Sequence, residues 1–159
     1  MKKYIVIPLL SILFVSCNAP TKEEREREFY TDKGSFDMGR IPLIKPFEVV
    51  TTEHSNWILQ ATDDTTGYFT VDGVKEVRVV NQFILVHSLN TTLNGARAKE
   101  GWFVIIPKTH FSKGFATHQE YLDLLHYEGF SEEPALYKIN TVFEYFDKHD
   151  TITWGSVSK

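Results

Sequence analysis

An apolar segment near the N-terminus ends at the only cysteine of the chain. Lys2 and Lys3 place positive charge ahead of it, Tyr4–Val15 is apolar, and the small residue Ser16 stands directly before Cys17. A positive region, an apolar region and a small residue in this order are typical of a signal peptide that is removed on export. We therefore expect residues 1–16 to be cleaved, and the mature chain to fold in an oxidising compartment without a disulfide.

The run Phe14-Val15-Ser16-Cys17 resembles the lipobox of bacterial lipoproteins, with Phe14 in the place of the usual leucine. In that family the cysteine thiol takes a diacylglycerol, the chain is cut before it, and the new N-terminus is usually acylated as well. The resemblance implies that Cys17 is lipidated, with fatty acyl chains such as palmitate, and that this lipid attaches the protein to a membrane of the cell envelope.

Two other interpretations of this segment remain open. A transmembrane anchor needs roughly 20 apolar residues, whereas this run is shorter and contains Pro8. An ordinary secretory signal would leave the position of Cys17 at the cleavage point as a coincidence. Lipidation accounts for both the length of the run and the place of the cysteine, so we expect Cys17 to be an anchor and not a nucleophile.

Composition limits what the rest of the chain can be. The remaining length suits one domain of the usual size of about 100 to 150 residues. Twelve Phe, seven Tyr and three Trp supply large side chains for an apolar core. The formal net charge is −4 and becomes more negative when Lys2 and Lys3 are removed. This charge argues against nucleic acid or an anionic membrane surface as the main partner.

Residues 17–40 are expected to form a lipidated cysteine followed by a flexible charged tether. Lys22–Glu28 is almost wholly charged and Thr31–Ser35 is rich in turn formers, so neither has the apolar side chains of a core. A short helix with internal ion pairs is the alternative for the charged run. Lys22-Glu23-Glu24 also resembles an acidic export signal that sends some lipoproteins to the outer face of the outer membrane. We expect an outer-membrane location, with the domain facing either the periplasm or the surface.

Period-two alternation begins at Ile41 and predicts a β-rich domain over residues 41–159. Glu53–Ser55 separates the first two strands as a tight connection, and Asp72-Gly73 is a strong signal for a hairpin turn. Asn81-Gln82 is either a bulge or a two-residue turn. The predicted strands are Phe47–Thr52, Asn56–Ala61, Tyr68–Val71, Val74–Val80, Gln82–His87 and the most apolar one, Gly101–Ile106, which we expect near the centre of a sheet.

Helices are predicted after these strands, over residues 117–128 and 141–148. Thr117 and Glu120 fit a capping box, and Gly129 fits a left-handed C-terminal cap. The second helix is shorter, with Asn140 or Thr141 as its expected cap. Segment 135–139 is a strand or an extended connection, and 151–154 an edge strand. The predicted fold is α+β, a mainly antiparallel sheet packed by one well-capped helix and a second short helix.

The search for catalytic motifs is negative. The chain has no Gly-x-Ser-x-Gly elbow, phosphate-binding glycine loop or His-Glu-x-x-His pair, which lowers the expectation of an enzyme. His110, His118 and His126 are spaced by eight residues, and on a helix this spacing leaves them about 80° apart. We therefore expect no metal site and no cofactor.

Three tryptophans, Trp57, Trp102 and Trp154, admit two interpretations. They form either an exposed platform for stacking a carbohydrate or part of the core. Trp102 lies in the most apolar predicted strand, and Trp154, near the C-terminal end, is the better candidate for exposure. Because aromatic side chains supply most of the buried area in small domains, we expect core packing for the set.

Two tripeptides, Asp64-Thr65-Thr66 and Asp150-Thr151-Ile152, resemble the Asp-Ser/Thr-apolar acceptor of a protein O-glycosylation system of some envelope proteins. Both lie in predicted turns, where such a modification needs its acceptor to be exposed. Thr65 and Thr151 are therefore candidate O-glycosylation sites.

A candidate ligand site is expected at the start of the first predicted helix of the domain. Lys108, His110 and Lys113 lie in the connection that leads to His118, and a helix N-terminus with nearby cations favours a carboxylate, phosphate or sulfate. The predicted loop over residues 90–99 could close over the same end. An ordinary solvated connection is the alternative, and the capping residues already occupy part of this helix end.

The middle of the domain resembles small uncharacterised lipoproteins through Tyr68–Val71, Phe83–Val86 and Trp102–Ile106. This resemblance implies no activity. The sequence thus predicts a lipid-anchored cell-envelope protein, a non-enzymatic binding or interaction module with an envelope protein or a glycan as its partner. A small envelope hydrolase and an immunity or inhibitor lipoprotein are the alternatives.

Overall fold

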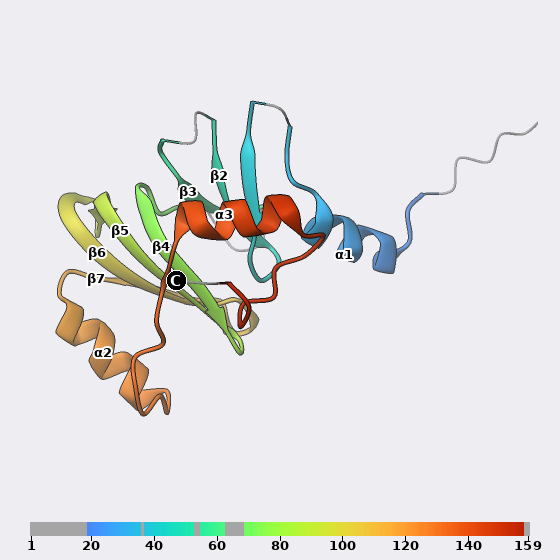
Figure 1. The fold of residues 1–159 in the computed structure, drawn as a ribbon. Coiled ribbons are helices and arrows are strands. Elements are labelled where there is room, and N and C mark those ends of the chain that lie inside the picture. The colour runs from blue at the N-terminus through green and yellow to red at the C-terminus, as the bar shows by residue number, and fades with distance from the viewer. Residues whose placement is uncertain (1–18, 36, 53–54, 63–68, 158–159) are drawn as a thin grey trace, which may run out of the picture.

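The computed structural model describes residues 19–35, 37–52, 55–62 and 69–157. They form an α+β fold, as the sequence predicts, but with two antiparallel sheets in the place of the single expected one (Figure 1). The helices are α1 (Lys22–Thr31), α2 (His118–Tyr127) and α3 (Ile139–Lys148), with a 3-10 turn at Pro107–Thr109. The strands are β1 (Gly39–Pro42), β2 (Phe47–Thr51), β3 (Ile58–Ala61), β4 (Val74–Val80), β5 (Phe83–Leu93), β6 (Ala96–Ile106), β7 (Phe111–Phe115) and β8 (Tyr137–Lys138).

The larger sheet has the strand order β7-β6-β5-β4-β8, and the smaller one the order β1-β2-β3. β6 contains the most apolar predicted strand and lies between two neighbours, as expected for residues buried on both faces. The five-stranded sheet separates two apolar clusters. One cluster joins a face of this sheet to the three-stranded sheet and α3, and the other joins the opposite face to α2.

A long hairpin of β5 and β6 replaces the loop predicted over residues 90–99. Its strands turn at Asn94 and Gly95, whose φ angles are 50° and 80°, and Leu93 pairs directly with Ala96. Asn-Gly is the pair that a two-residue turn with both φ angles positive favours. The loop prediction was therefore wrong, because the polar residues on either side of this turn continue the strands. At the other end of β5, Asn81-Gln82 is a two-residue turn between Val80 and Phe83.

Asp72-Gly73 does not form the predicted hairpin. Val71 pairs with Leu59 of the smaller sheet, while Val74 pairs with Ser88 of the larger one. Gly73 has φ 67°, and its carbonyl accepts a hydrogen bond from the Leu89 N–H at 3.0 Å. The glycine therefore marks the point where the chain crosses from one sheet to the other.

Helix α2 forms as its sequence signals predict. The Thr117 side chain accepts a hydrogen bond from the Glu120 N–H, and the Glu120 carboxylate accepts one from the Thr117 N–H. At the other end Gly129 has φ 91°, and the Phe130 N–H donates to the Leu125 carbonyl at 3.0 Å. The capping box and the left-handed glycine after the helix provide hydrogen-bond partners for backbone N–H and C=O groups that the ends of a helix otherwise leave unpaired.

Helix α3 begins two residues before its predicted start, so it is as long as α2 at ten residues. Its N-cap residue is Lys138, which makes no side-chain capping bond. Asn140, an expected cap, instead accepts a hydrogen bond from Trp57 Nε1 at 3.0 Å. Tyr137–Lys138 pairs with β4, so part of segment 135–139 is a strand. Residues 151–154 form no strand, and that prediction was wrong.

The charged run after residue 21 is the helix α1, and the segment that follows it packs on the domain. Phe29 is buried, and Arg40 lies in β1 with only 7% of its surface exposed. Arg40 Nη1 donates to the carbonyls of Phe29 and Asp32 at 2.8 and 2.6 Å. The second half of the expected flexible tether is therefore an ordered part of the fold, held by cation contacts at the C-terminal end of α1.

Candidate functional site

A row of polar and aromatic side chains crosses the five-stranded sheet beside the N-terminal end of α2. Glu76 of β4 lies opposite His87 of β5 in the strand register, and His87 lies opposite Trp102 of β6. Directly paired residues of antiparallel strands point to the same face. The three side chains therefore share one face of the sheet, the face that packs against α2 further along the strands.

His87 is held from both sides by carboxylates. Its Nδ1 lies 3.0 Å from Glu76 Oε2, and its Nε2 lies 2.7 Å from Glu100 Oε1. The His87 side chain is 17% exposed, against 36% for Glu76 and 46% for Glu100. Because both ring nitrogens are engaged, the imidazole has no free nitrogen with which to take a proton from a bound molecule. The arrangement fixes the ring and orients both carboxylates.

A stack of aromatic rings runs from β5 to α2 over Trp102. The rings of His87 and Trp102 are 5.3 Å apart and nearly parallel, and the rings of Trp102 and His118 are 5.2 Å apart. His118 also stacks on Tyr121 at 5.8 Å, and its Nε2 lies 2.9 Å from Glu133 Oε1. The stack ties the first turn of α2 to the sheet and to the segment after α2.

Tyr121 ends this stack inside the core. Its side chain is fully buried, and its hydroxyl has no hydrogen-bond partner among the described residues. Burial raises the pKa of Tyr121 far above its usual range, and the charge of Glu133 raises it further. The hydroxyl therefore stays neutral, since ionisation would leave an unsolvated phenolate.

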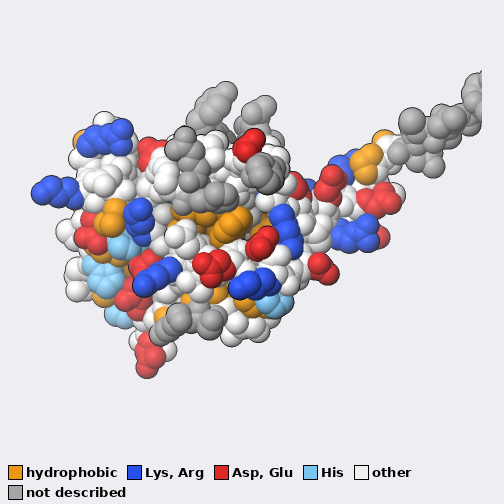
Figure 2. All heavy atoms as spheres, turned by 45° about the horizontal axis from the view of Figure 1, so that its top comes forward, with side chains coloured by type: hydrophobic (Ala, Val, Ile, Leu, Met, Phe, Trp, Pro, Cys, Tyr) orange, Lys and Arg blue, Asp and Glu red, His pale blue; other side chains and the backbone are white. Residues whose placement is uncertain are grey.

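Two neighbouring cavities meet at Glu76 and His87, and we refer to them together as the groove. One cavity, of about 460 Å³, is lined also by Trp102, His118 and the segment Glu133–Leu136. The other, of about 440 Å³, is lined by Ser55, Trp57, Lys75, Glu76, His87, Leu89 and Lys138–Thr141. Figure 2 shows histidine side chains beside acidic ones on the side of the molecule that carries the five-stranded sheet and α2.

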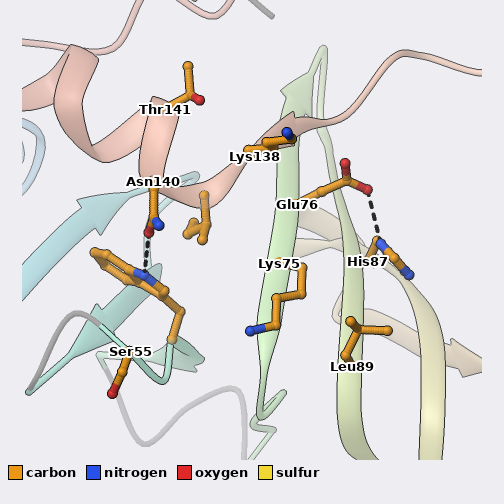
Figure 3. Close-up of a pocket in the computed structure, with 10 residues that line it drawn as sticks. Ser55, Lys75, Glu76, His87, Leu89, Lys138, Asn140 and Thr141 are labelled. Carbon is orange, nitrogen blue, oxygen red and sulfur yellow. Dashed lines mark hydrogen bonds and ion pairs between the residues drawn. The ribbon is translucent and has the colours of Figure 1, made fainter.

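The second cavity lies between the start of α3 and the strands β4 and β5 (Figure 3). Lys75 occupies an irregularity in the pairing of β4 with β5, where the register shifts between Val74 and Glu76. A bulge of this kind turns a side chain away from the regular alternation. Lys75 and Lys138 are exposed, and within the described part of the chain neither has an ion-pair partner.

The four predicted ligand-binding residues do not form one site. Lys108 and His110 precede β7, whereas His118 follows it, so the length of this five-residue strand separates them. Lys113 lies within β7, with its Nζ 4.9 Å from the centre of the Phe115 ring. The connection was predicted as a loop, but its residues Phe111–Phe115 pair with β6 as an edge strand. Only His118 lines the groove.

Of the other predicted residues, Trp57 and Trp102 line the groove. Cys17 and Thr65 lie outside the described residues, and Thr151 is exposed in the segment that follows α3. Trp57 is 2% exposed, as core packing requires. Trp102 is half-buried and covered by two histidine rings.

Sequence reasoning missed Glu76, His87, Glu100 and Glu133. The residues come from two neighbouring strands, a third strand and a connection, so their meeting depends on strand register and on the path after α2. The signal that existed was a histidine in a strongly apolar strand, where a polar ring needs partners on its neighbours.

Within residues 19–35, 37–52, 55–62 and 69–157, no three His, Cys, Asp or Glu side chains are arranged to hold a metal ion. The helices of this same part are too short or too polar to span a membrane. Comparisons of the chain with protein-family models, curated protein sequences and solved structures find no match.

Proposed function

We propose that this protein is a lipid-anchored binding protein of the bacterial cell envelope, and that the groove is its ligand-binding surface. The observation that carries the second part is the meeting of two cavities at the fixed pair Glu76 and His87. Each cavity has a volume of about 440 to 460 Å³, within the usual range of roughly 300 to 1,000 Å³ for small-molecule sites. Charged and hydrogen-bonding groups line both, beside apolar walls.

The contacts of His87 favour a binding function over a hydrolytic one. A general base needs a nitrogen within reach of the proton that it takes. Both nitrogens of His87 face carboxylates at 2.7 and 3.0 Å, so a substrate would have to break one of these contacts first. The same contacts hold a rigid polar wall, which is what a recognition surface requires.

The lipid anchor rests on the sequence pattern that ends at Cys17. Lipid on this residue would hold the domain near the bilayer, because α1 begins only five residues later and is tied to the domain through Phe29 and Arg40. One fatty acyl chain binds a bilayer weakly and reversibly, so the two or more chains of a bacterial lipoprotein are needed for stable attachment.

Replacing Cys17 by serine tests the anchor. We expect Cys17→Ser to abolish incorporation of an alkyne-tagged fatty acid in growing cells, and to leave the protein either uncleaved or released from the membrane. Metabolic labelling followed by fractionation measures both. A wild-type protein that partitions to membranes without incorporating label would contradict lipidation, and unchanged labelling of Cys17→Ser would place the lipid elsewhere.

An amide-shift screen of small polar compounds against the mature protein tests the groove. We expect compounds that bind to shift the amides of Glu76, His87 and residues 136–140. Leu89→Trp, which fills the cavity that Leu89 lines, should remove the shifts of residues 138–140, whereas Tyr127→Ala, at a side chain that is 85% exposed on α2, should leave all shifts unchanged. Binding that maps to another surface, or shifts of residues 138–140 that survive Leu89→Trp, would overturn the groove as the ligand site.

A further inference from the structure

The His87 ring joins side chains of three neighbouring strands. Its Nδ1 lies 3.0 Å from Glu76 Oε2 on β4, and its Nε2 lies 2.7 Å from Glu100 Oε1 on β6. An ionised carboxylate only accepts hydrogen bonds, whereas a neutral imidazole has one N–H donor and one acceptor nitrogen. A neutral His87 can therefore donate to one of the two carboxylates, but not to both.

Both contacts together require an imidazolium ring, which has two N–H donors. In that state each carboxylate accepts a charge-assisted hydrogen bond. Trp102 supports the same state, because its ring lies nearly parallel to that of His87 with the centroids 5.3 Å apart. An aromatic face attracts a cation within about 6 Å. The arrangement in this structure is thus that of a protonated ring.

Further charged or titratable side chains lie on the elements around the ring. They are Lys75 and Arg78 of β4, Lys138 of β8, His118 of α2 and Glu133 of the segment after α2. Arg78 Nη1 donates to the Ala135 carbonyl at 2.9 Å, and Glu133 Oε1 lies 2.9 Å from His118 Nε2. These three side chains are held at the wall of the first cavity. The two lysines have no ion-pair partner within the described part of the chain.

Lys138 gives Glu76 a second possible partner. The two residues are directly paired in the register of β4 with β8, so their side chains share one face of the sheet. Both line the second cavity. Figure 3 shows the Glu76 carboxylate turned toward His87, with Lys138 beside it and the Lys75 side chain pointing away. A small rotation of Glu76 is therefore enough to exchange the imidazole for the ammonium group.

We propose that Glu76 changes its partner with the protonation of His87. With a protonated ring, Glu76 accepts from Nδ1, as in this structure. When the ring loses a proton, it is the Nδ1 proton that passes to solvent, and Nε2 keeps its N–H on Glu100 because that contact is the shorter one. The Glu76 carboxylate then faces an acceptor nitrogen and moves to the Lys138 ammonium group.

The change of partner alters the charge of the second cavity. The ring loses its positive charge, and Lys138 becomes paired with a carboxylate. An anionic compound that binds there should lose at least about threefold in affinity when the pH rises through the transition. This consequence rests on the proposed function of the groove, whereas the change of partner does not and can be measured without a ligand.

Nuclear magnetic resonance of the mature protein, labelled with ¹⁵N-histidine, tests the inference. Two-bond ¹H–¹⁵N correlations report the protonation of each ring nitrogen. We expect both nitrogens of His87 to be protonated at about pH 5 and only Nε2 at about pH 8, the range over which histidine charge ordinarily changes. The side-chain carbon shifts of Glu76 and Lys138 should follow with the same midpoint.

Two variants separate the change of partner from an ordinary titration. In Glu76→Gln the amide N–H can donate to Nδ1, so a neutral ring satisfies both contacts, and the Lys138 shift should no longer follow His87. In Lys138→Met the ring should still titrate, but the accompanying shift of Glu76 should shrink. A Lys138 shift that persists in Glu76→Gln would overturn the inference. So would loss of the proton from Nε2, or a proton on Glu76 or Glu100 with a neutral ring at about pH 5.

Discussion

Replacing Arg40 by methionine is expected to lower the free energy of unfolding by about 3–5 kcal/mol, the usual cost of leaving a buried ion without its partner. Arg40 Nε lies 2.5 Å from Glu48 Oε2, and both side chains are more than 90% buried. Among the residues that the structure describes, the Glu48 carboxylate in Arg40→Met keeps only the hydrogen bond from Gln60 Nε2 at 3.0 Å. Urea unfolding followed by circular dichroism measures the loss.

The double variant Arg40→Met, Glu48→Met is the matched control. It removes both charges and fills the site with apolar side chains, so we expect it to be more stable than Arg40→Met alone. In both variants α1 loses the cation that contacts the carbonyls of Phe29 and Asp32, and its amides should exchange faster with solvent. A double variant as unstable as the single one would show that the buried charge of Glu48 is not the source of the loss.

Gly73→Ala is expected to lower the free energy of unfolding by about 2–5 kcal/mol. Gly73 has φ 67°, and a Cβ atom there would lie 2.0 Å from the Leu89 carbonyl oxygen. A left-handed alanine costs roughly 1–2 kcal/mol, and forcing an extra atom into a packed site adds about 1–3 kcal/mol. The carbonyl belongs to β5 and cannot move without disturbing the sheet.

Gly95→Ala separates these two contributions. Gly95 has φ 80°, but a Cβ atom there has no neighbour within 4 Å, so only the backbone cost of about 1–2 kcal/mol applies. Chemical denaturation of the two variants side by side measures the difference. Equal losses of unfolding free energy would mean that the backbone around Gly73 can move to make room for the Cβ atom.

Local signals predicted the elements that depend on neighbours in sequence. Helix α2 has a capping box, Thr117 with Glu120, and a left-handed glycine after its last turn, Gly129. Both signals lie within or next to α2, so they can be recognised from the sequence without knowledge of the tertiary fold. The alternation in β4 and the continuous apolar run in the second half of β6 are signals of the same kind. These features indicate the α+β class because the predicted strands and helices have apolar faces that can be buried against one another.

Signals that depend on a distant partner were misread. Asp72-Gly73 indicates a positive φ, which it has, but it does not say whether the chain turns back or crosses to another sheet. Asn140 has the side chain of a helix cap, yet Trp57, 83 residues away, supplies its hydrogen bond. The groove could not be predicted for the same reason, because Glu76, His87 and Trp102 are brought together by the strand register.

The most direct test of the central claim, that the groove is the ligand-binding surface, is the position of a bound compound from the amide-shift screen. Intermolecular nuclear Overhauser effects between the compound and the protein measure this position. We predict contacts to residues that line the groove, such as Trp102, Leu136, Leu89 and Ile139. Contacts confined to a surface away from these residues would contradict the account.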